Sequence, residues 1–111
     1  MSKNPDLLQL SQMLNEIAME LHQKKAETDD PALHTALNNE LIEVNHRITV
    51  LGGLIFAQRT DEISAAVRRV EASKEELARA IEEINQINQI IDTAAAFLGL
   101  VDTCIDLAKR F

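Results

Sequence analysis

The sequence predicts an all-α protein: an antiparallel bundle of three helices with coiled-coil-like packing, in which the third helix is much the longest. Three observations lead to this fold class. The 111 residues include only two Pro and three Gly, so there is little material for turns. Residues that favour helices, such as Leu, Ala, Glu and Gln, are abundant. Apolar residues recur at alternating steps of three and four positions, which is the heptad spacing of helices that pack along a seam.

The composition indicates one helical domain over residues 1–111 and narrows the classes of partner. The formal net charge is -7, and a negative field repels phosphate backbones and anionic lipids. We therefore expect no nucleic-acid partner, and membrane binding is disfavoured. The single cysteine, Cys104, excludes an internal disulfide and fits a reducing compartment. Since no segment resembles a signal peptide, we expect a cytoplasmic protein.

The first helix is predicted over residues 5–27. Asn4 is a typical N-cap, Pro5 suits the first helical position, and Asp6 is an acid at the positive end of the helix dipole. Apolar residues then return at steps of three and four and define one face: Leu7, Leu10, Leu14, Ile17 and Leu21. The short gap that follows predicts that the second helix folds back antiparallel to the first.

The second helix is predicted over residues 31–58, with Asp30 as the N-cap and Pro31 at its first position. Gly52 and Gly53 lie inside its apolar pattern, where each glycine costs roughly 1 kcal/mol relative to Ala. Either the helix ends there, or it continues and another backbone approaches closely. We favour continuation, because a loop over residues 54–57 would expose four apolar side chains to water.

The third helix is predicted over residues 61–110, beginning at the cap-like segment 60–62. Its heptad d positions are apolar without exception: Ile63, Val70, Leu77, Ile84, Ile91, Leu98 and Ile105. The a positions are interrupted by Lys74, Asn88 and Asp102. An Asn at an a position can specify register and oligomeric state, so Asn88 is a candidate for that role. The alternative is that such positions lie at the edge of the helical face and reach water.

A straight third helix would be about 75 Å long, roughly twice the length of the others. Either it breaks near Asp92 to Gly99 and folds back as a fourth helix, or it stays long and a second chain covers its apolar second half. We favour the long helix, and with it a homo-oligomer, most simply a dimer. The predicted partner or oligomer interface consists of Ile87, Ile90, Ile91, Ala94, Phe97, Leu98, Val101, Cys104 and Ile105.

No constellation in the sequence indicates catalysis. Glu43 and His46 have the spacing of a bundle di-iron motif, but the apolar stripe through Val44 and Ile48 places them on the outer side of the helix. Cys104 has no His near it in the heptad phase, and we expect it to be packed between helices. We therefore predict no enzyme activity, no catalytic residue, no cofactor and no metal site.

The sequence favours a non-catalytic protein–protein interaction module, namely a self-associating acidic bundle that also binds a second protein. Inhibitors, immunity factors, chaperones and assembly adaptors are proteins of this kind. The alternative is a membrane-active protein that inserts the apolar hairpin tip over residues 50–57.

Overall fold

The computed structural model of the chain describes residues 2–83 and 86–110, and these residues form helices joined by short connections. The helices are α1 (Pro5–Glu27), α2 (Pro31–Gly52), α3 (Asp61–Glu82) and α4 (Ile87–Lys109). No strand occurs in this part of the chain. The predicted all-helical class is therefore confirmed.

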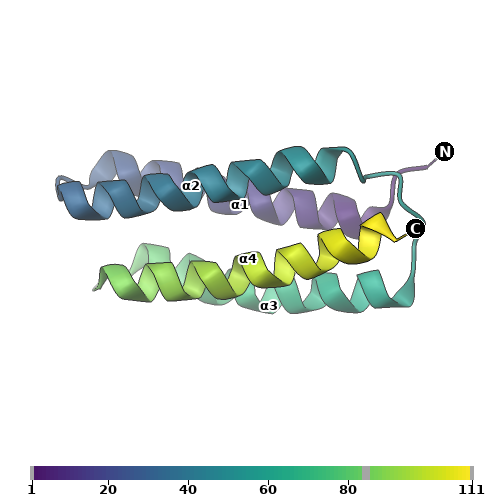
Figure 1. Cartoon of the computed structure of the whole chain (residues 1–111). Helices are drawn as coiled ribbons and strands as arrows, with labels where there is room; N and C mark the ends of the chain where they lie inside the picture. Colours follow the sequence, from purple (N-terminus) through teal and green to yellow (C-terminus); the bar gives the residue numbers. More distant parts are fainter. Residues whose placement is uncertain (1, 84–85, 111) are drawn as a thin grey trace.

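The four helices lie in two layers, with α1 beside α2 in one layer and α3 beside α4 in the other (Figure 1). Across the layers α1 packs on α3 and α2 packs on α4. Helices stacked in this way run in the same direction, because Gln9 bonds Glu71 and Lys24 bonds Glu82 at nearly constant sequence separation. The connection from α2 to α3 therefore crosses the end of the bundle, where both chain termini also lie.

The core lies between the two layers. Each amphipathic helix contributes the apolar residues of its buried face. The largest fully buried side chains of the core are Phe97, Leu7, Leu10, Leu14, Ile17, Leu21, Leu37, Leu51, Ile63, Leu77, Ile90 and Val44.

Asn4 holds the start of α1 against the α2–α3 connection. Its Oδ1 accepts hydrogen bonds from the backbone N–H groups of Asp6 and Leu7, as expected of an N-cap. Its backbone N–H donates to the Ile55 carbonyl at 2.7 Å, and its Nδ2 donates to the Ala57 carbonyl at 3.1 Å. This buried side chain thus joins segments more than fifty residues apart.

The second helix is shorter than predicted, because α2 ends at Gly52 and not near Gln58. The expectation that a loop here would expose four apolar side chains is also wrong. Leu54 and Ala57 pack against the core, and of the four only Phe56 is largely exposed, at 49%. The connection folds over the end of the bundle, where Asn4 donates hydrogen bonds to its carbonyls at Ile55 and Ala57.

The structure also differs from the single helix expected over residues 61–110. The helix ends at Glu82, Glu83 leaves the helical conformation (φ -107°, ψ 46°), and α4 begins after an extended Gln86. The break thus comes earlier than the alternative considered near Asp92 to Gly99. Ile84, a predicted d position, lies outside the described residues. The break changes the apolar phase, so that Ile90 is fully buried whereas Ile91, expected in the stripe, is 41% exposed.

Candidate interaction surfaces

Because of the break before α4, most residues of the predicted partner interface are buried within this chain. Once α4 folds back onto α2 and α3, this chain itself covers most of the proposed interface. The members buried in its own core are Ile90, Ala94, Phe97, Leu98, Val101, Cys104 and Ile105. Ile87 is half-buried and Ile91 is exposed. A second chain is therefore not needed to cover most of this segment, and of the predicted interface residues only Ile87 and Ile91 are at least partly exposed.

The polar residues at predicted a positions have separate surroundings. Asn88 is exposed in the first turn of α4. The ammonium of Lys74 pairs with Glu16 on α1, and Asp102 accepts two hydrogen bonds of 3.0 Å from Arg47 on α2. Lys74 and Asp102 thus connect the two layers of the bundle through ion pairs within one chain.

The side chains considered for chemistry lie apart from one another. Glu43 and His46 are both exposed, and Glu43 pairs with Arg47. Cys104 is fully buried, and this burial raises the pKa of its thiol to about 11. The thiol is therefore protonated at neutral pH and shielded from reagents. Among the described residues, no group of three or more His, Cys, Asp and Glu side chains is arranged to hold a metal ion.

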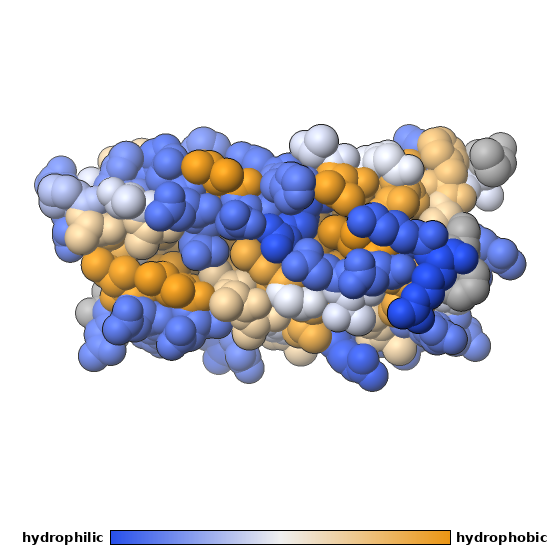
Figure 2. Space-filling model, viewed as in Figure 1, coloured by the Kyte–Doolittle hydropathy of each residue, from blue (hydrophilic) through white to orange (hydrophobic). Residues whose placement is uncertain are grey.

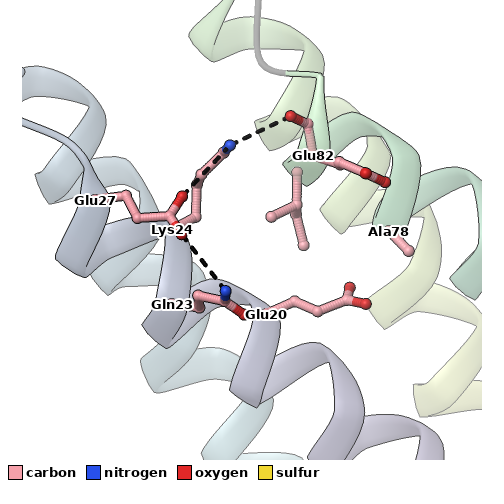
Figure 3. Close-up of a pocket in the computed structure, with 7 residues that line it drawn as sticks. Glu20, Gln23, Lys24, Glu27, Ala78 and Glu82 are labelled. Carbon is pink, nitrogen blue, oxygen red and sulfur yellow. Dashed lines mark hydrogen bonds and ion pairs between the residues drawn. The ribbon is translucent and has the colours of Figure 1, made fainter.

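One long face of the bundle, formed by α1 and α3, is rich in charge, and we refer to it as the charged face. Its polar side chains connect the two helices: Gln9 bonds Glu71, Glu16 pairs with Lys74, and the Lys24 Nζ donates to the Glu82 carbonyl at 3.2 Å. A hollow of about 360 Å³ opens near Lys24. Figure 3 shows side chains from both helices around it.

Glu20 lies in this hollow, with its side chain directed toward α3 (Figure 3). Its Oε2 is buried and has no hydrogen-bond partner among the described residues. Burial, helped by the neighbouring carboxylates of Glu16, Glu82 and Glu75, raises the pKa of Glu20, although Lys74 opposes the shift. The charged form of Glu20 is thus poorly accommodated.

The outer surface of the α1–α2 layer is very different. The buried stripe of α1 is centred near Leu14 and Leu21, and at 100° per residue Met19 points about 160° away from it. Met19 is 71% exposed. It belongs to a row of uncharged residues at steps of three and four along α1: Leu8, Ser11, Asn15, Met19, His22 and Ala26.

Helix α2 contributes a second uncharged row beside the first. Asn38 marks its position, because Asn38 accepts a hydrogen bond of 2.9 Å from Lys25 on α1. Ile42, which is 58% exposed, lies one turn further along the same side. The row comprises Thr35, Asn38, Ile42, Asn45 and Thr49. The charged residues of α2 lie toward α4 instead, where Arg47 pairs with Asp102.

We call the two rows together the neutral face. Within the described residues, its rows contain no Asp, Glu, Lys or Arg, and Lys25 lies between them, bonded to Asn38. Acids return at the end of the hairpin, at Asp29 and Asp30. Figure 2 views the bundle from the side of α2 and α4. It shows a small hydrophobic group over α2 among hydrophilic side chains, and a larger hydrophobic area over the first half of α4.

Several side-chain hydrogen-bond donors on the neutral face are already bonded to carbonyls of their own helix. The Asn15 Nδ2 donates to the Ser11 carbonyl at 2.9 Å, and the hydroxyls of Thr35 and Thr49 donate to the carbonyls four residues earlier in α2. A donor already bonded to its own backbone loses less when water is removed. The neutral face can therefore be covered at lower cost than its polar composition suggests.

The apolar pattern of the sequence does not mark the neutral face, because most residues of the face are polar. The detectable signal was the absence of charge at positions 8, 11, 15, 19, 22 and 26, on the side opposite the core stripe.

Comparisons with models of protein families, with curated proteins and with solved structures find no match to this chain. None of the described helices is long and apolar enough to cross a membrane.

Proposed function

We propose that this protein is a non-catalytic protein–protein interaction module that self-associates and binds a second protein, as an inhibitor, immunity factor, chaperone or assembly adaptor does. The observation that carries the proposal is the neutral face, where Met19 and Ile42 are exposed on the hairpin of α1 and α2. Large apolar side chains in the middle of a polar surface are typical of interface centres.

Sedimentation velocity over a concentration series tests the self-association. We expect a weight-average mass that rises from one chain toward two as the concentration increases. A mass of 12.4 kDa at every concentration would contradict this part of the proposal.

The second partner is proposed to be a basic protein, since the net charge of -7 favours association with a positive surface. Capture from the source cell at low and high salt tests this. The partner should have a basic surface and dissociate as salt rises. A partner that is itself acidic, and is retained at high salt, would contradict the proposed charge pairing.

The membrane alternative has one observation in its favour, the exposed Phe56 at the end of the bundle. Against it, Leu54 and Ala57 of the same segment pack on the core. Flotation with neutral and anionic liposomes distinguishes the two functions: an interaction module stays with the protein fraction, whereas a membrane-active protein floats with the lipid.

A further inference from the structure

We infer that the occupant of the neutral face is a second copy of this chain, docked so that Met19 of each copy lies against Ile42 of the partner subunit. This inference rests on the proposed self-association and names the surface through which it occurs. It differs from the interface expected on the segment 87–105, most of which the chain buries itself.

Charge selects a second copy for this surface. Each copy carries a net charge of -7, so two copies repel one another wherever carboxylates meet. The charged face would bring Glu16, Glu71 and Glu75 toward the same residues of the other copy. The rows of the neutral face contain no carboxylate, so two copies meet there with the least repulsion. A basic partner, in contrast, gains most by docking elsewhere.

The positions of the two exposed apolar residues along the hairpin fit a dimer with two-fold symmetry. The Lys25–Asn38 hydrogen bond fixes the register of the hairpin. With a rise of 1.5 Å per residue, Met19 and Ile42 lie about 9 Å and 6 Å along the hairpin from that bond, on the same side of it. A two-fold axis parallel to the helices then stacks α1 of each copy on α2 of the other and brings Met19 against the partner's Ile42. Such a contact is reciprocal, as closed dimers require.

The size of the face suits a dimer of moderate strength. The bundle measures 46 × 20 × 16 Å between its Cα extents, so a long face covers on the order of 700 Å², near the ~800 Å² that each partner contributes to a standard interface. Two apolar contacts at the centre and locally satisfied polar groups around them resemble the usual core and rim.

The test measures the dimer dissociation constant of the full chain by sedimentation equilibrium. Met19→Glu and Ile42→Glu each place a charge at the centre of the contact, and we expect each to raise the dissociation constant by at least tenfold. Ala95→Glu adds the same charge to an exposed position on α4 and should change it less than about threefold. Circular dichroism verifies that each variant is folded.

Ile91→Glu tests the rival surface with the same substitution. If Ile91→Glu dissociates the dimer while Met19→Glu and Ile42→Glu leave it intact, the copies associate through α4 and the inference is overturned, although the proposed self-association stands. If the wild-type chain is a monomer throughout, both the inference and the self-association are overturned.

Discussion

Helix α1 takes part in two long faces that differ in what their polar side chains do. On the charged face, shared with α3, side chains bridge the helices: Gln9 bonds Glu71, and Glu16 pairs with Lys74. On the neutral face, shared with α2, Asn15 and Thr49 instead bond the backbone of their own helix. The charged face thus joins the two layers of the bundle, whereas most of the neutral face does nothing for the fold of the single chain.

This difference separates surface that is needed for folding from surface that is free for a partner. A charge pair between helices loses its geometry when a partner displaces it, while a locally bonded Asn or Thr keeps its bond when it is covered. Apart from Asn38, which bonds Lys25, we therefore expect the neutral face to tolerate substitutions better than the charged face. The predictions below test this division.

The largest loss of stability is expected outside both faces, at the residue that joins the start of α1 to the α2–α3 connection. Asn4→Ala removes the N-cap of α1 and the Nδ2 bond to Ala57. We expect a loss of about 2–3 kcal/mol in the free energy of unfolding, and a melting temperature lower by about 8–12 °C. Asn4→Ser keeps a capping oxygen and should lose about half as much. Thermal unfolding by circular dichroism measures both, and equal losses in the two variants would show that the Ala57 bond dominates.

A smaller change, an increase in the melting temperature, is expected from a substitution on the charged face. Because the pKa of Glu20 is raised in the folded protein, its ionisation at neutral pH opposes folding, and stability from this group falls as pH rises through the folded pKa. Glu20→Gln should therefore raise the melting temperature at pH 7 by about 1–3 °C.

The dependence of the melting temperature on pH distinguishes the burial of the Glu20 carboxylate from a general stabilising effect of the substitution. Well below pH 4.5, the unperturbed value, Glu20 is protonated in both the folded and the unfolded state, and the advantage of Glu20→Gln should vanish. Glu76→Gln, at an exposed position of α3, is the matched control. An advantage of Glu20→Gln that is constant from pH 4 to pH 7 would contradict the role of burial.

The smallest effect is expected from salt on the dimer. Since the rows of the neutral face contain no carboxylate, raising sodium chloride from about 50 to 500 mM mainly screens the overall repulsion between the copies. The dissociation constant should stay within about threefold or decrease. Sedimentation equilibrium at both salt concentrations measures it, and a marked weakening would indicate that ion pairs hold the copies together.

The starts of α1, α2 and α3 could be predicted from the sequence because caps are local, whereas the start of α4 follows Gln86, which makes no side-chain cap bond. The side chains of Asn4, Asp30 and Thr60 each accept a hydrogen bond from the first turn of the following helix, as their types suggest. The end of α2 at Gly52 and the break after Glu82 could not be predicted in the same way. Both depend on contacts with distant parts of the chain. Asn4 bonds the connection at Ile55, and α4 packs against α2 and α3.

The surfaces were harder to predict than the helices. The exposure of Met19 follows from the helical phase of α1 alone, but its neighbour Ile42 follows only once α2 is known to lie beside α1 in that register. Likewise Ile90 replaced Ile91 in the core because the break shifted the apolar phase by one residue. The local pattern thus predicted which helices are amphipathic, and packing decided which of their apolar side chains are buried and which are exposed.

The most direct test of the neutral face is a disulfide between copies. Two single variants, Met19→Cys and Ile42→Cys, are mixed under mild oxidation, and covalent dimers are measured on a non-reducing gel; the buried Cys104 does not compete. A control mixture of Gln12→Cys and Glu75→Cys places the thiols on the charged face. The account predicts more covalent dimer in the first mixture than in either variant alone or in the control. Equal amounts of covalent dimer in all of these samples would contradict it.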